Sequence, residues 1–259
     1  MRILFLADIV GTPGRQAIAD RLPSLREELG VDVCIANGEN VADGVGITPK
    51  LADRLLAAGV DAITLGNHVW RRVEIAPYLT GSDRVARPAN LASSAPGKGL
   101  VFTTARDGTP VAAINVMGSL FMDVPASMWE VIDGLVEEAQ RQTHVILVDV
   151  HAEATSEKVA LATWLDGKVT AVIGTHTHVQ TNDARVLPGG TAALSDAGMT
   201  GPHNSVIGVQ SELAIKRMRT GLPVRFETAA GDVRIEGALI DCDGDGRASA
   251  CRTVRVPVA

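Results

Sequence analysis

Hydrophobic and polar positions in the first 70 residues alternate between short apolar runs and longer stretches with helical spacing. The apolar runs predict buried strands, and the stretches between them predict helices. The predicted strands are RILFLADIV (2–10), VDVCIANGEN (31–40) and VDAITLGNHVW (60–70), and the predicted helices cover 13–29 and 48–59. Strands and helices that alternate at this length indicate βαβ units and a sheet that begins largely parallel.

The first predicted helix contains two prolines, which are expected to affect it differently. Thr12 is the expected N-cap, because Pro13 would then stand at the first helical position, where its missing N–H costs nothing. Pro23 falls inside the helical pattern and is expected to split or kink it.

In the rest of the chain the order of predicted strands and helices changes twice. Residues 99–118 form two β-like runs around Asp107-Gly108, which predicts a hairpin. The strand–helix–strand order then returns, and the last quarter predicts antiparallel strands. The further predicted elements are helices at 125–142, 155–165 and 208–220, strands within 143–153 and 168–181, a short strand and a Gly-rich loop at 191–202, and turns at 229–232 and 242–247.

We find no internal repeat, linker or low-complexity segment, so the pattern predicts one α/β domain over residues 1–259. The domain is expected to hold one mixed sheet, or two sheets packed face to face between helices.

Composition and charge exclude several classes of protein. Apolar residues make up 46% and charged residues 21% of the chain, so a disordered protein is excluded. The net charge is −6 with no strongly basic stretch, which argues against binding to duplex DNA but leaves a small anionic substrate open. No run approaches the roughly 20 apolar residues of a membrane span, so no membrane contact is expected. Three cysteines without a C-x-x-C pair indicate a reduced, cytoplasmic setting.

Polar side chains stand at the ends of five predicted strands: Asp8, Glu39 with Asn40, Asn67 with His68, His151, and His176 with His178. The carboxyl ends of strands in an open α/β sheet converge on one edge, where ligands bind. Each position alone has an ordinary structural explanation, since Asp often caps a helix and a single His is often structural. Because the same arrangement occurs five times, the sequence favours one common site.

The residue types in this set are typical of a metal site. Carboxylate, amide oxygen and imidazole suit Fe, Mn or Zn. The set is too large for one tetrahedral zinc and contains no thiolate. Two ions about 3.5–4 Å apart, bridged by a carboxylate, would use all of it, and Glu39 is the natural bridge. His176 and His178 would project the same way from an extended backbone and serve one ion each.

The order of these motifs resembles that of the calcineurin-like metallophosphoesterases, which carry D-x-H, G-D, G-N-H, H and G-H-x-H. Here the first motif is "DIV", without its histidine, and "GEN" replaces G-D. Both departures match a smaller bacterial branch, the YmdB-type phosphodiesterases. The resemblance covers nearly the whole chain through the segments LFLADIVGTPGR, NGENVADGVGIT, LGNHVW, VDVHAE, GTHTHVQT and DAGMTGP.

This resemblance implies a metallophosphoesterase-type αββα sandwich, with mixed sheets flanked by helices, and two ions, Fe and/or Mn or alternatively Zn. One ion would be held by Asp8, Glu39, Asn40 and His178, and the other by Glu39, Asn67, His151 and His176. Asn40 could equally contact the ligands without binding the ion itself. Because the histidine of the D-x-H motif is missing, the first ion would have one imidazole ligand fewer.

The resemblance also implies hydrolysis of small phosphodiesters, namely 2′,3′-cyclic nucleotides, to nucleoside 3′-phosphates. A metal-bound hydroxide would attack the phosphorus, and His68, a non-ligand, would protonate the leaving alkoxide. Two alternatives stay open: a phosphomonoesterase or nucleotidase on the same site, and a metal-containing regulator that binds a nucleotide or RNA with little turnover. The sequence also leaves a homo-oligomer open.

Three further features carry weaker expectations. Residues 195–204 predict a Gly-rich rim loop, in which Gly198, Met199 and Thr200 would contact the substrate, or a plain β–α connection. His203 is expected to be exposed. His144 precedes its strand at the end opposite His151, so no catalytic role is expected for it.

Overall fold

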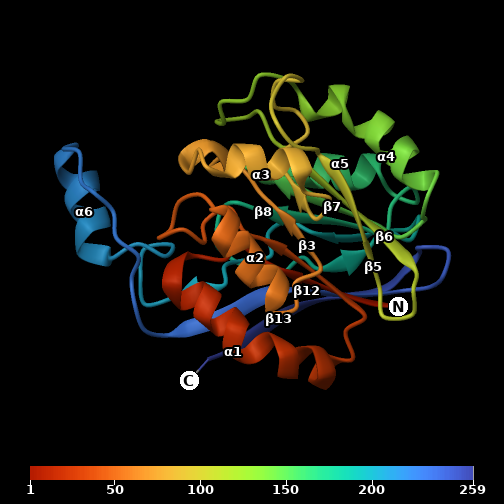
Figure 1. Ribbon diagram of the computed structural model, residues 1–259, viewed down its shortest axis with the longest axis horizontal. Coiled ribbons are helices and arrows are strands. Elements are labelled where there is room, and N and C mark those ends of the chain that lie inside the picture. The colour runs from red at the N-terminus through yellow and green to blue at the C-terminus, as the bar shows by residue number, and fades with distance from the viewer. Residues whose placement is uncertain (259) are drawn as a thin grey trace.

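The computed structural model describes residues 1–258 and shows two β-sheets face to face between layers of helices (Figure 1). The first sheet has the order β11 (Gly201–Pro202), β12 (Val233–Cys242), β1 (Arg2–Leu6), β2 (Val33–Asn37), β3 (Ala62–Thr64) and β4 (Val85–Ala86), with β13 (Ala248–Pro257) also paired to β12. The second has the order β5 (Leu100–Thr104), β6 (Pro110–Met117), β7 (Ile146–His151), β8 (Ala171–Thr175), β10 (Ala192–Leu194) and β9 (Arg185–Val186).

Both sheets are mixed, with parallel strands at their centres. Strands β1 to β4 are parallel, and β12 joins β1 antiparallel. In the second sheet β6, β7, β8 and β10 are parallel, whereas β5 and β9 run antiparallel at the edges. The predicted parallel start, the hairpin around Asp107-Gly108 and the antiparallel C-terminal strands are therefore confirmed.

The helices cover the outer faces of the sheets: α1 (Gly11–Leu29), α2 (Pro49–Ala57) and α3 (Ile75–Gly81) on the first, and α4 (Ile132–Gln140) and α5 (Thr155–Trp164) on the second. Two short 3₁₀ helices cover Val69–Arg71 and Met128–Glu130. Helix α6 (Ser211–Thr220) projects from the body of the molecule (Figure 1). No helix within residues 1–258 is long and apolar enough to cross a membrane.

Three apolar clusters fill the spaces between these four layers. Along β1, Leu4 and Leu6 pack toward the helices, while Ile3 and Phe5 pack toward the second sheet. This alternation follows from the two-residue period of a strand. A third cluster lies between the second sheet and helices α4 and α5. The predicted αββα sandwich is thus confirmed.

Helix α1 differs from its prediction at two points. It begins at Gly11, so its N-cap is Val10, and Thr12 is helical and caps nothing. The backbone N–H of Gly11 instead donates to the carbonyl of Asn40. Pro23 does not split the helix, because Pro23 and Ala19 are both exposed, so the backbone group that loses its hydrogen bond is not buried.

A candidate metal centre where the strand ends meet

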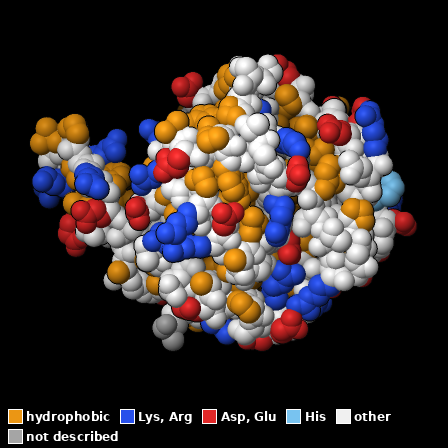
Figure 2. Space-filling model, in the orientation of Figure 1, with side chains coloured by type: hydrophobic (Ala, Val, Ile, Leu, Met, Phe, Trp, Pro, Cys, Tyr) orange, Lys and Arg blue, Asp and Glu red, His pale blue; other side chains and the backbone are white. Residues whose placement is uncertain are grey.

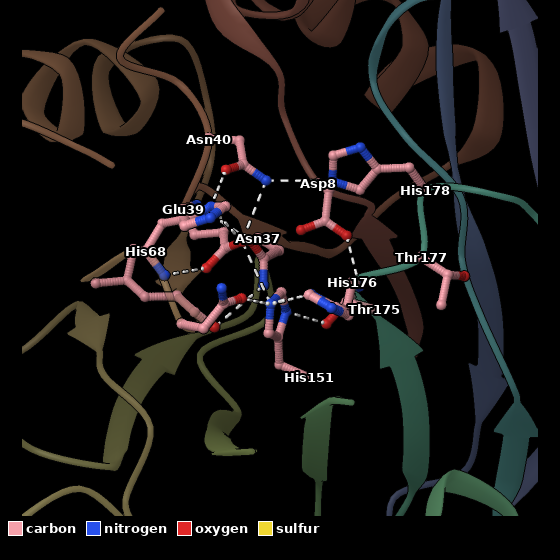
Figure 3. A network of polar contacts seen from close by, with 12 residues as sticks. Asp8, Asn37, Glu39, Asn40, His68, His151, Thr175, His176, Thr177 and His178 are labelled. Atoms are coloured by element: carbon pink, nitrogen blue, oxygen red, sulfur yellow. Dashed lines mark hydrogen bonds and ion pairs between the residues drawn. The ribbon is translucent and has the colours of Figure 1, made fainter. Parts of the chain in front are cut away.

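Both sheets contribute polar side chains to one cluster at the carboxyl ends of their central strands (Figure 3). From the first sheet come Asp8 after β1, Glu39 and Asn40 after β2, and Asn67 and His68 after β3; from the second come His151 at the end of β7, and His176 and His178 after β8. The structure therefore brings all five predicted strand ends together.

One half of the cluster is centred on His151. Its Nε2 atom lies 2.9 Å from Asn67 Oδ1, 3.1 Å from His176 Nδ1 and 3.3 Å from Glu39 Oε1. Glu39, His151 and His176 can each offer one ligand atom within 4.8 Å of the others. Donor atoms this close together could bind the same cation. Since several of these atoms carry lone pairs, they repel each other unless a cation or a proton lies between them.

The other half contains Asp8 and His178. Asp8 is fully buried, and its Oδ2 accepts from the backbone N–H of His176 at 2.9 Å, but its Oδ1 has no partner within the described residues. Leaving a buried carboxylate oxygen unpaired is costly, and a cation would satisfy it. His178 Nδ1 donates to the carbonyl of Ile207 at 3.0 Å, so its Nε2 lone pair faces Asn40 Nδ2 at 3.2 Å. This half also fits a metal ion.

Glu39 lies between the two halves and is 1% exposed. Its Oε2 accepts from the backbone N–H of His68 at 2.9 Å, while its Oε1 lies 3.1 Å from His68 Nδ1. Asn40 Nδ2 donates to the same Oε1 at 3.2 Å. A buried carboxylate with contacts on both sides is well placed to bridge two cations.

The charges of the cluster are strongly perturbed. Burial raises the pKa of Asp8. Burial acts on Glu39 in the same direction, but His151 and His68 together outweigh it and hold the pKa of Glu39 well below its ordinary value. Burial lowers and Glu39 raises the pKa of His151, which comes to about 9, whereas burial and His151 lower the pKa of His176 to about 3. Opposite shifts within one buried cluster are typical of functional sites.

Sequence reasoning missed Asp149, which supports His151 from behind. Asp149 is fully buried; it accepts from Thr175 Oγ1 at 2.6 Å and from Asn37 Nδ2 at 2.9 Å. Thr175 Oγ1 in turn accepts from His151 Nδ1 at 2.9 Å. This chain of hydrogen bonds fixes the ring of His151 with its Nε2 atom facing the cluster. The available signal was a charged residue inside the apolar strand ILVDVH.

We expect Asp149→Asn to weaken metal binding without removing a ligand. Its amide cannot accept from both Thr175 and Asn37 as the carboxylate does, so His151 loses its fixed orientation. Outer partners of this kind change metal affinity by about 10–100-fold. Metal titration should place Asp149→Asn between the wild type and His151→Ala, and wild-type affinity would contradict a role for Asp149.

The backbone that carries His176 and His178 differs from the prediction. Strand β8 ends at Thr175, and His176 and His178 have φ angles of 100° and 63°, so the expected extended backbone is wrong. Thr177 between them donates from N and Oγ1 to Asp196 Oδ2, at 3.1 and 2.8 Å. Lys158 Nζ donates to the same oxygen at 2.8 Å. This buried ion pair holds the turn that presents both imidazoles.

His68 lies beside the cluster, and its side chain is 25% exposed. Its Nδ1 donates to Asn40 Oδ1 at 2.7 Å. The ring also lines a cavity that opens over the cluster. His144, in contrast, is exposed ahead of β7, at the other end of the strand from His151.

The loop after β10 does not form the expected rim. Gly198, Met199 and Thr200 are buried, and Met199 N and Thr200 Oγ1 donate to Glu236 on β12. His203 is not exposed as expected; it is half-buried, with Nε2 3.3 Å from Glu236 Oε2. These contacts join the loop to the first sheet, so its position does not support a contact with substrate.

Two mixed sheets between helices, with carboxylate, amide and imidazole side chains gathered at the strand ends, define a protein of the metallophosphoesterase type. Residues 4–254 match the model of a family described as YmdB-like protein, and the chain belongs to that family.

Individual relatives match this chain over nearly their whole length. The chain is 45% identical to the 2′,3′-cyclic-nucleotide 2′-phosphodiesterase of Bacillus subtilis (strain 168), covering 94% of this chain and 92% of the relative. A crystal structure of a hypothetical protein from Thermus thermophilus is 41% identical, with a TM-score of 0.92 and 99% of both chains covered. A novel phosphatase from Mycoplasma pneumoniae is 31% identical, with a TM-score of 0.90, 99% of this chain and 93% of that one covered.

Proposed function

We propose that this chain is a metal-dependent phosphodiesterase that hydrolyses 2′,3′-cyclic nucleotides to nucleoside 3′-phosphates. The observation that carries the proposal is the convergence of Glu39, His151 and His176, with His68 beside them at the mouth of a cavity. The printed activity of the Bacillus subtilis relative supports this choice of substrate.

The donor atoms fit two cations. We assign Asp8, Glu39, His178 and, through its Oδ1 atom, Asn40 to one ion, and Glu39, Asn67, His151 and His176 to the other. Carboxylate, amide and imidazole ligands without a thiolate suit Fe and/or Mn, with Zn as the alternative. When bound, the ions would polarise the phosphate and stabilise the charge of the transition state.

His68 would act on the leaving group. Its Nδ1 donates to Asn40 Oδ1, which fixes the ring and leaves Nε2 free to hold a proton. Opening the cyclic diester by cleavage of the P–O2′ bond releases the 2′ oxygen as an alkoxide, which needs that proton. Imidazole is the side chain that most often serves as a general acid in catalysis.

His68→Ala is expected to keep its metals but lower turnover of a 2′,3′-cyclic nucleotide by about 10²–10⁴-fold, the usual contribution of a general acid. Elemental analysis and steady-state kinetics should be done on the same preparation. His144→Ala, an exposed histidine at the other end of its strand, is the matched control and should change neither quantity. Unchanged turnover in His68→Ala would remove it from the mechanism.

A phosphomonoesterase on the same site is the alternative, favoured by the name of the Mycoplasma pneumoniae relative. Comparing kcat/KM for a nucleoside 2′,3′-cyclic phosphate and a nucleoside 3′-phosphate separates the two activities. Hydrolysis of either substrate that stops on metal removal and returns on metal addition would exclude a regulator that only binds.

A further inference from the structure

A cavity of about 550 Å³ extends from the cluster of polar side chains toward the projecting segment 207–228. Asn40, His68 and His178 line it on the cluster side, and the residues around α6 line the other. Its volume is in the range of roughly 300–1,000 Å³ that holds small-molecule ligands. The cavity is therefore larger than the cluster alone requires.

Positively charged side chains outnumber carboxylates in this cavity. The chain as a whole has a net charge of −6. The charged lining residues, apart from histidines, are Arg71, Arg72, Arg217, Arg225, Asp43 and Glu227. An acidic protein that gathers four arginines in one cavity has a local preference for anions.

Three of these arginines, Arg71, Arg217 and Arg225, form no ion pair with a carboxylate within residues 1–258. Arg72 lies 3.8 Å from Asp43, so part of its charge is already paired. Arg71 and Arg225 are exposed and have no carboxylate partner within residues 1–258. Arg217 lies over the ring of Phe226, with its guanidinium carbon 5.0 Å from the ring centre.

Phe226 gives the same side of the cavity an aromatic surface. Its side chain is 40% exposed, although most large apolar side chains of this protein are buried. Figure 2 shows orange, blue and red side chains together on the projecting lobe that α6 forms. An exposed aromatic ring beside arginines is the usual platform on which a nucleobase stacks next to its phosphates.

We propose that this cavity binds a second phosphate group, on the 5′ side of the nucleotide whose cyclic phosphate reacts. The base would stack on the face of the Phe226 ring that Arg217 does not cover, and the 5′ phosphate would lie against Arg217 and Arg225. The reacting diester carries one negative charge, which the bound cations would already offset, so the arginines have charge left for another anion. The preferred substrates would be cyclic-phosphate ends that carry a 5′ phosphate.

This inference rests on the proposed function. A 5′ phosphate has two sources: a mononucleotide with a 5′-phosphate, or the last phosphodiester of an RNA chain that ends in a 2′,3′-cyclic phosphate. The arginines recognise the shared phosphate chemistry, and a comparison of substrates distinguishes the two sources.

The test compares three substrates with the same base: adenosine 2′,3′-cyclic phosphate, its 5′-phosphorylated form, and the dinucleotide ApA with a 2′,3′-cyclic phosphate. The wild type should show a KM at least about tenfold lower for the second or third substrate than for the first, as expected for a charged hydrogen bond. A lower KM for both substrates indicates that the site binds a phosphate from either source. A lower KM for the dinucleotide alone identifies an RNA end as the substrate, and a lower KM for the mononucleotide alone identifies the 5′-phosphate.

Arg217→Gln/Arg225→Gln should remove that preference by raising KM, with kcat unchanged and with the first substrate unaffected. Lys216→Gln/Arg219→Gln is the matched control, because both side chains are exposed on α6 outside the cavity. No preference in the wild type, or equal losses on all three substrates, would overturn the inference. Failure to hydrolyse even adenosine 2′,3′-cyclic phosphate would instead refute the proposed function.

Discussion

Gly66→Ala is expected to remove most metal binding and hydrolysis. A Cβ at position 66 would lie 2.3 Å from Glu39 Oε2 and 2.4 Å from His151 Nε2, well inside van der Waals contact. Both atoms belong to proposed ligands, and both side chains are buried, so neither can swing away into solvent. A displacement of about 1 Å in a reacting site can cost about 10²-fold in rate. We therefore expect at least that loss in kcat/KM.

The measurement pairs metal content with kcat/KM for a 2′,3′-cyclic nucleotide, and follows unfolding of the metal-free proteins. Gly134→Ala in α4 is the control, because its Cβ would meet nothing within 4 Å. Alanine inside a helix should stabilise the protein by roughly 0.5–1 kcal/mol. Full metal occupancy in Gly66→Ala would show that Glu39 and His151 have room to move and are not held as the structure indicates.

Much of this arrangement could be predicted because it follows local rules. Alternation along strands such as residues 2–6 predicts which side chains enter each apolar layer, and parallel strands bring their ends to one edge. Asp8, Glu39 and His151 could be grouped on that basis. The order of the motifs then indicated the family to which the chain belongs.

What could not be predicted depends on contacts between distant segments. The left-handed backbone at His176 and His178 is held by Asp196 on the neighbouring strand connection, and nothing in the local sequence indicates it. Arg217 on α6 and Arg225 after it likewise show no local sign in the sequence of lining the cavity beside the cluster. Their position depends on the path of a projecting helix, which helical spacing does not determine.

Replacing one partner of the ion pair between Lys158 and Asp196 is expected to destabilise the protein strongly. Its side chains are 3% and 2% exposed, and Nζ lies 2.8 Å from Oδ2. Removing one partner from a buried pair leaves an uncompensated charge and costs about 3–5 kcal/mol. Lys158→Met and Asp196→Asn should each lower the free energy of unfolding by about that amount. Urea unfolding of the metal-free protein measures it without the contribution of bound ions.

The double variant Lys158→Met/Asp196→Asn should recover most of that loss, because no buried charge is left unpaired and the amide oxygen still accepts from Thr177. The exposed pair Lys98–Asp83, with side chains 57% and 81% exposed, is the control, and Lys98→Met should cost less than about 1 kcal/mol. Asp196→Leu removes the acceptor for Thr177 as well, so it should also lower metal content by freeing the turn that presents His176 and His178. Additive losses in the double variant would mean that the two charges do not stabilise each other, and that the turn is held by other contacts.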